Sequence, residues 1–290
     1  MKKRYTKKVR FRDGDGFVHG FSTGKVKVKS GFKTAKCGPI GSKLNFLIDN
    51  EWTAYLPILV WVIDHPEGVF VVDTGENERV NEGNYFKKEG ALLNYINKSS
   101  FEFKVEKKDE IGPQLQELGY TQQDIEKVIL THLHLDHFDG LSYFDSTPIF
   151  LSQLEWDKPS FTMPSLYPAW FEPNTIKLDY RRTTLFERIS DLNETGEIQL
   201  IHTPGHTEGH CSVLVKTQDI HYFLAGDVTY DQNQLENNIN AGGHQNFKNS
   251  INTYSKVKAY ASEYNLVYLP SHDEHSLDRL ERDKILSPIF

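Results

Sequence analysis

Apolar residues in the first half of the chain fall in short runs, which predict strands rather than helices. Residues 25–30 (KVKVKS) alternate between polar and apolar side chains, as a strand does when one face is buried. Three further runs, at 44–49, 57–64 and 68–75, are rich in β-branched and aromatic residues. Because the turn-forming stretch 65–68 (HPEG) separates the last two runs, we expect them to form a hairpin.

The pattern changes near residue 111, after which helical and strand segments follow one another. Residues 111–120 carry Pro113 near their start and Gly119 near their end, the placement typical of the two ends of a helix. Apolar side chains recur every three or four residues from Phe247 to Tyr264, which predicts an amphipathic helix. Further strands are expected at 127–132, 147–152, 197–203, 211–216, 221–227 and 266–270.

Strands followed by helices, twice over, indicate an α/β fold in which two β-sheets pack together with helices outside. No change of composition divides the halves, so we predict one domain over residues 1–290. Residues 153–185 differ from the rest, because they contain four prolines and a concentration of aromatic side chains. Prolines discourage regular helix or strand, so we expect this stretch to be an insertion or lid.

The composition limits the classes of protein that need be considered. With 290 residues, 38% of them hydrophobic, the chain can bury a large core. A formal net charge of −7 argues against a nucleic-acid partner, which would need a basic face. No apolar run has signal-peptide length or approaches the roughly 20 residues of a membrane span. Two cysteines, Cys37 and Cys211, do not indicate a disulfide framework, so we expect a cytoplasmic protein.

Metal-binding side chains crowd together in residues 131–140 (THLHLDHFDG), directly after an apolar run. His132 and His134 point the same way at the end of a strand and can converge on one metal ion. If the chain then turns, Asp136 and His137 can face a second ion. Imidazole and carboxylate ligands without thiolate suit zinc. The alternative, a polar loop with chance histidines, is disfavoured because three more motifs follow.

The three further motifs also lie at the ends of apolar strands. Residues 202–212 (HTPGHTEGHCS) offer three candidate ligands, His202, His206 and His210. Asp227 ends a strand and could bridge two cations through its two oxygens, and His272 comes just past the last strand. Loops at strand ends build functional sites on the rim of a rigid scaffold. The histidines outside these motifs are expected to be surface or core residues: His19, His65, His221 and His244.

Together these motifs resemble the metallo-β-lactamase superfamily, whose fold is an αββα sandwich with a dinuclear metal site at the sheet edges. The resemblance runs from about residue 57 to 273 and includes VFVVDTG, in which Asp73 would support the metal ligands. It implies two Zn²⁺ ions per chain. One ion would bind His132, His134 and His206, the other would bind Asp136, His137 and His272, and Asp227 would bridge them, whereas His202 and His210 match no ligand position.

Within the superfamily the chain is most similar to the N-acyl homoserine lactone lactonases, which quench quorum sensing. The hairpin at 56–75, the D-x-x-Y pattern from Asp227 to Tyr230, and SHD at 271–273 carry this resemblance. It implies a hydrolase in which a metal-bridging hydroxide opens the lactone ring of a small acyl lactone. Tyr230 would contact the substrate carbonyl, unless it is simply a packed aromatic, and Asp136 would pass a proton to the leaving ring oxygen.

Other readings of the same motifs remain open. An organophosphate hydrolase of this fold could share the site, and so could a thioesterase of the glyoxalase II type. The thioesterases resemble two-domain chains with a helical tail, and only a short stretch follows His272 here. A non-catalytic member would be expected to lack a ligand, yet all seven positions are filled. Neither a nucleic-acid nor a membrane partner is expected, and the chain could be a monomer or a homodimer.

Overall fold

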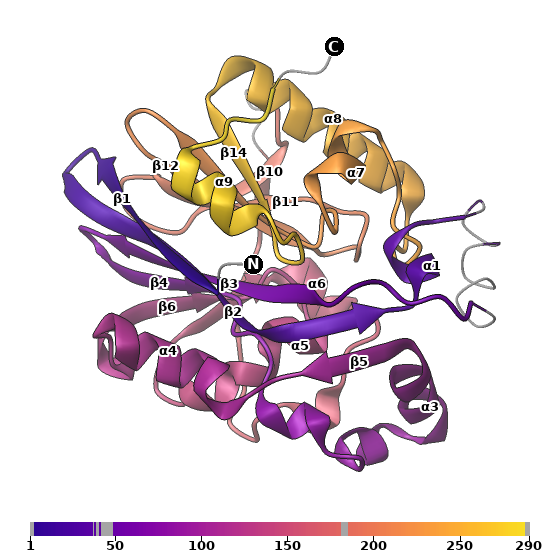
Figure 1. Cartoon of the computed structure of the whole chain (residues 1–290). Helices are drawn as coiled ribbons and strands as arrows, with labels where there is room; N and C mark the ends of the chain where they lie inside the picture. The colour runs from indigo at the N-terminus through magenta and orange to yellow at the C-terminus, as the bar shows by residue number, and fades with distance from the viewer. Residues whose placement is uncertain (1–2, 37, 39–40, 42–48, 181–184, 288–290) are drawn as a thin grey trace.

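Two β-sheets pack face to face with helices on their outer sides (Figure 1). The computed structural model describes residues 3–36, 38, 41, 49–180 and 185–287. Cys37 and all but the last residue of the strand predicted at 44–49 lie outside these ranges. Within them no helix has the length and apolar character needed to cross a bilayer. The two packed sheets with helices on their outer sides confirm the predicted α/β sandwich.

The first sheet has the strand order β1-β2-β3-β4-β6-β7-β8 over the described residues, with β5 paired to β2. Its strands are β1 Arg4–Phe11, β2 Gly14–Val28, β3 Leu56–His65, β4 Gly68–Val72, β5 Phe101–Lys104, β6 Ile125–Ile129, β7 Ile149–Ser152 and β8 Asn174–Ile176. The second sheet has the order β14-β13-β12-β11-β10-β9. Its strands are β9 Asp179–Tyr180, β10 Arg188–Asp191, β11 Ile198–His202, β12 Cys211–Lys216, β13 His221–Gly226 and β14 Leu266–Pro270.

Helices cover the outer face of each sheet (Figure 1). The helices of the described residues are α1 Ser30–Lys33, α3 Ala91–Ser100, α4 Ile111–Leu118, α5 Leu135–Phe138, α6 Gln153–Asp157, α7 Gln232–Glu236, α8 Phe247–Glu263 and α9 Ser276–Arg282. Helix α9 differs from the outer helices, because its Leu277 and Leu280 pack with Trp61 in the core between the sheets. The predicted amphipathic helix is confirmed as α8, whose Tyr254 and Val257 pack with Phe223 and Tyr268 of the second sheet. The helix predicted at 111–120 is α4, and it ends at Gly119 in the left-handed conformation (φ 90°) that glycine adopts without strain.

Strand β3 shows how the core is arranged. Trp61 faces the interior between the sheets, whereas Val60 and Val62 face the helices on the other side. A strand buried on both faces needs an uninterrupted apolar run, which is what the sequence has at this position. The expected hairpin with β4 is confirmed, with Trp61 opposite Val72 in an antiparallel pair.

The segment 153–185 connects one sheet to the other. Its strand β8 extends the first sheet beside β7, and β9 pairs with β10 of the second sheet. Tyr167 and Phe171 pack against the outer core of the first sheet. Phe161 is 60% exposed and has a positive φ of 52°, which is strained for a bulky side chain. The segment therefore contributes to both sheets as well as to the surface.

Candidate metal centre

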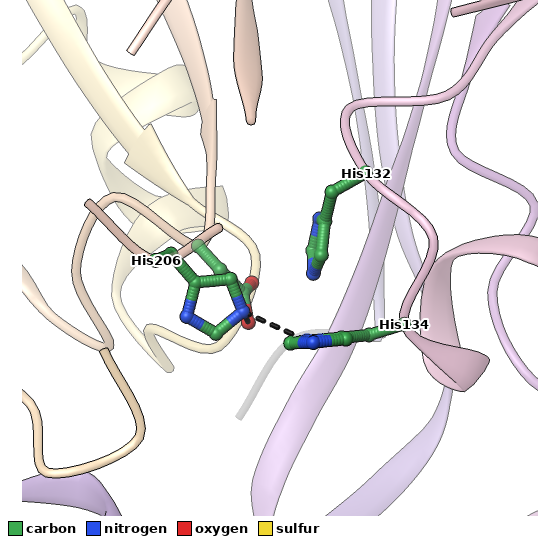
Figure 2. Close-up of side chains that lie close together, drawn as sticks. His132, His134 and His206 are labelled. Atoms are coloured by element: carbon green, nitrogen blue, oxygen red, sulfur yellow. Dashed lines mark hydrogen bonds and ion pairs between the residues drawn. The ribbon is translucent and has the colours of Figure 1, made fainter. Parts of the chain in front are cut away.

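Three histidines and an aspartate gather where β6, β11 and β13 end. His132 and His134 lie in the loop between β6 and α5, His206 follows β11, and Asp227 follows β13. The candidate ligand atoms of these four residues lie within 4.8 Å of one another. His134 Nδ1 is 2.8 Å from His206 Nε2, and Figure 2 shows His206 facing His132 and His134 across the centre. These residues form the first ligand group.

The second ligand group consists of Asp136, His137 and His272, whose candidate ligand atoms also lie within 4.8 Å of one another. Asp136 and His137 are in α5, directly after His134, and His272 follows β14. His272 Nε2 lies 3.3 Å from Asp136 Oδ2, and His137 Nε2 lies 3.8 Å from Asp136 Oδ1. The structure therefore brings all seven predicted ligands together.

Asp227 stands between the two groups. Its Oδ2 lies 3.3 Å from His206 Nε2, whereas its Oδ1 lies 3.3 Å from His137 Nε2 and 3.4 Å from His272 Nε2. Each carboxylate oxygen thus faces a different group. This is the arrangement expected of a ligand shared by two cations.

The turn that presents His206 needs the glycine that precedes it. Gly205 has a positive φ of 145°, and a Cβ built on it would lie 2.3 Å from Ser250 Oγ in α8. The loop directly before α8 also holds the turn, since its Gln245 N–H donates to the His206 carbonyl oxygen. The predicted Pro-Gly turn is therefore held against α8 with His206 pointing into the centre.

Buried atoms at the centre fit bound cations. Three buried atoms form no hydrogen bond with the residues that the structure describes: His132 Nε2, and also His137 Nε2 and Asp227 Oδ1, which face each other as an ion pair at 3.3 Å. Leaving such atoms without a partner costs about 1–3 kcal/mol each. Cations between the groups would satisfy all three atoms, and imidazole with carboxylate is a donor set that divalent transition metals accept.

The two groups differ in charge. Burial lowers the pKa of His132 and His206 well below the ordinary value, so both are neutral, the form that binds metal. Burial opposes charge on His137 and His272 too, but it is outweighed by neighbouring carboxylates, above all Asp73 for His137 and Asp227 for His272. The pKa of His272 rises to about 9, and that of His137 is also raised. Cations entering the second group would displace these protons.

Asp73 supports the ligands from behind, as the resemblance implies. Its Oδ2 accepts a hydrogen bond from His137 Nδ1 at 2.8 Å, which leaves His137 Nε2 facing the centre. Its Oδ1 accepts from Thr131 N–H at 2.8 Å. The left-handed backbone of Asp73 (φ 59°) turns the chain out of β4 toward these partners. His272 is oriented similarly, because its Nδ1 donates to the Pro57 carbonyl oxygen at 2.9 Å.

Two contacts from segment 153–185 were not predicted from the sequence. Glu155 is fully buried; its Oε1 accepts from Leu133 N–H at 3.1 Å, and its Oε2 accepts from Thr207 Oγ1 at 2.6 Å. It thereby joins the loops that carry the first ligand group. The Ser160 carbonyl oxygen accepts from His134 Nε2 at 3.1 Å. No motif marks either residue in the sequence, where Glu155 stands in the largely polar stretch SQLEWDK (152–158).

Tyr230 lies beside the second ligand group. Its ring stacks on the His272 ring, with centroids 5.5 Å apart, and it also packs against Val26 and Ile58. Burial and the nearby Asp227 and Asp136 carboxylates raise its pKa, so the phenol keeps its proton. Tyr230 is therefore a packed aromatic beside the second ligand group, with a phenol that remains protonated.

Three further histidines belong to neither ligand group: His202, His210 and His244. His202 donates from Nε2 to the Glu208 carbonyl oxygen at 2.9 Å and takes no part in either ligand group. His210 is buried against Asp227, and its Nε2 accepts from Asp227 N–H. His244, expected to be a surface or core residue, is buried with its ring centroid 5.5 Å from that of His206.

Comparison with known proteins gives one consistent result. Residues 54–272 match the sequence profile of the metallo-beta-lactamase superfamily. An N-acyl homoserine lactonase from a Bacillus species is 29% identical over 223 residues, which cover 75% of this chain and 82% of that protein.

Two solved structures establish the shared fold. An N-acyl homoserine lactone hydrolase with N-hexanoyl-L-homoserine at its catalytic metal centre has a TM-score of 0.72 and 20% identity, covering 98% of this chain and 99% of that one. AidC, a dizinc quorum-quenching lactonase, has a TM-score of 0.61 and 15% identity, covering 94% and 92%. This chain belongs to the metallo-beta-lactamase superfamily.

Proposed function

We propose that this protein is a metal-dependent hydrolase that opens the lactone ring of N-acyl homoserine lactones. The position of Asp227 between two ligand groups carries the proposal, because it suits a pair of cations. The relatives named N-acyl homoserine lactonases support the choice of substrate. The product would be the open-chain N-acyl homoserine.

The seven clustered residues would hold two zinc ions. His132, His134 and His206 would bind one ion, Asp136, His137 and His272 would bind the other, and Asp227 would bridge them. Imidazole and carboxylate ligands without a thiolate support zinc, and so does the dizinc centre of AidC. When bound, a pair of such ions supplies an activated water near neutral pH and a Lewis acid for the carbonyl oxygen.

The side chains around the centre would guide charge and protons during ring opening. The Tyr230 phenol, protonated in this setting, would donate a hydrogen bond to the carbonyl oxygen as negative charge develops on it. Water adds its oxygen to the carbonyl carbon of the lactone, the bond from that carbon to the ring oxygen breaks, and the ring oxygen takes a proton. The Asp136 side chain is 17% exposed, the most open carboxylate of the centre, and it would take the proton that the attacking water releases and pass it to the ring oxygen.

The test is a substrate panel given to the purified, zinc-loaded protein. Acid release would be followed with N-acyl homoserine lactones of increasing chain length, alongside an S-acyl glutathione thioester and a phosphotriester. We expect the lactones to give the highest kcat/KM, with no turnover after chelation of the metal. Faster hydrolysis of the thioester or phosphotriester than of every lactone would instead favour one of the two alternative hydrolases.

A further inference from the structure

His210 is a buried histidine next to the metal centre that belongs to neither ligand group. Its ring centroid lies 5.1 Å from that of His132. Its Nε2 accepts a hydrogen bond from the main-chain N–H of Asp227 at 3.0 Å. The residue therefore contacts the main chain of the shared aspartate rather than its carboxylate.

The hydrogen bonds on the other side of the ring determine which nitrogen carries the proton. His210 Nδ1 lies 3.1 Å from the Thr203 carbonyl oxygen, which can only accept, so Nδ1 carries the hydrogen. Thr203 Oγ1 is bonded to Ser212 Oγ, which donates to the Ala225 carbonyl oxygen. Because Nδ1 carries the hydrogen of the neutral ring, His210 Nε2 keeps a lone pair, which accepts the hydrogen bond from Asp227 N–H.

The end of β13, directly before Asp227, has a backbone conformation that brings the Asp227 N–H close to His210 Nε2. The pairing of β13 with β14 shifts register between Leu224 and Gly226, as at a β-bulge, and Gly226 is left-handed (φ 57°). A Cβ at Gly226 would lie 2.8 Å from His210 Nε2. The glycine therefore allows the close approach that brings Asp227 N–H onto the imidazole.

We propose that His210 is a positioning residue that fixes the main chain of Asp227 so that both carboxylate oxygens reach their ions. The Asp227 side chain is short, so the reach of its two oxygens depends on where its Cα lies. Without the acceptor, the buried N–H would lose its partner and the backbone would shift to find another. The inference rests on the proposed two-ion centre, but not on the identity of the substrate.

Two amide substitutions separate the two nitrogens of His210. In His210→Asn the amide occupies the place of Nδ1, so the bond to Thr203 remains and the acceptor for Asp227 is lost. In His210→Gln the amide oxygen extends to the place of Nε2 and can accept from Asp227 N–H. His65→Asn is the matched control, because His65 is also buried and hydrogen-bonded, to Glu67 and Glu197, outside the ligand groups.

The readouts are retention of Zn²⁺ against EDTA and the visible spectrum of the protein loaded with Co²⁺. We expect His210→Asn to lose zinc at EDTA concentrations about 10–100-fold lower than wild type and to shift the cobalt bands. His210→Gln should follow the wild-type curve, and His65→Asn should lower thermal stability only. A His210→Asn protein with wild-type zinc retention and spectrum would overturn the proposal, as would equal damage from Gln and Asn.

A measurement on the wild-type protein covers the case in which His210→Asn does not fold. Nitrogen-15 NMR of histidine-labelled, zinc-loaded protein reports which imidazole nitrogen of His210 carries hydrogen. We expect the Nδ1–H tautomer with an unprotonated Nε2. The opposite tautomer would exclude acceptance from Asp227 N–H and would refute the proposal, whatever the outcome of the lactone assay.

Discussion

The metal centre and segment 153–185 touch each other but are held in place in different ways. In the centre, directional hydrogen bonds hold the candidate ligands; the His137 ring, for example, is held by Asp73 on the side away from the centre. In the segment, aromatic rings contact one another edge to face, and Trp156 and Trp170 are 37% and 39% exposed. Yet Glu155 of this segment is fully buried and bonds both ligand loops. Substitutions should therefore have their largest effects at residues that form directional hydrogen bonds, whether these lie in the metal centre or in the segment.

The largest effect is expected for Asp227→Ala. Without the shared carboxylate the two cations would repel each other, and three buried imidazole nitrogens would lose the anion that they face. We expect the variant to retain one metal ion or fewer after zinc saturation and to lose lactone hydrolysis. Metal analysis and acid release measure the two effects. Asp219→Ala, at an exposed turn, is the control; a fully loaded Asp227→Ala protein would contradict the shared role.

Tyr230→Phe should separate chemistry from metal binding. The ring would still stack on His272, so metal content should be unchanged. One oxyanion donor is typically worth about 2.7–4 kcal/mol, and a cation sharing the carbonyl oxygen would make the loss in kcat smaller. Kinetics of the zinc-loaded variant, with the exposed Tyr264→Phe as control, measure this. Wild-type kcat on every lactone would leave Tyr230 as a packing residue alone.

The same contrast explains what could be predicted from the sequence. The ligands could be predicted because they crowd just past a buried strand, although His132 and His134 lie in the loop after β6 rather than in the strand predicted at 127–132. Helix α5 then carries Asp136 and His137. Supports that come from elsewhere in the chain have no such clustering in the sequence. Glu155 bonds Leu133 and Thr207 only because α6 lies against both loops.

Strand β1 was missed for a related reason. No strand was predicted from the sequence over these basic residues, although they pair with β2 along the whole length of β1. Only tertiary pairing makes this polar stretch a strand, since one face of it stays exposed. Residue spacing therefore predicts which side chains gather at the centre better than it predicts what surrounds them.

Glu155→Gln tests whether segment 153–185 supports the centre. The amide retains one acceptor oxygen, so either Leu133 N–H or the Thr207 hydroxyl would face an NH₂ group. Such a loss at a buried site costs about 1–3 kcal/mol. We expect a lower Tm and easier removal of zinc by EDTA, whereas Asp157→Asn at the exposed end of the same helix should change neither. Unchanged zinc retention would confine Glu155 to a role in stability.

The smallest effects are expected from the aromatic side chains of the segment, which we propose set acyl-chain preference rather than chemistry. Each methylene buried against them would add up to about 0.8 kcal/mol. Trp156→Ala and Trp170→Ala should therefore flatten the rise of kcat/KM with chain length while sparing short lactones. Phe171→Ala should do the same but also lower the Tm, because Phe171 packs against Tyr167 and the first sheet's outer core.

The alternative for these aromatics is an ordinary hydrophobic cluster under a long connection. Trp156, Trp170 and Tyr167 all contact the Phe171 ring, so such a cluster exists in any case. Chain-length dependence separates the two roles, because a cluster that only stabilises the fold would affect short and long lactones alike. Tyr95→Ala, at an exposed aromatic of α3, controls for loss of surface apolar area. Equal losses on short and long lactones in all three variants would refute the pocket role.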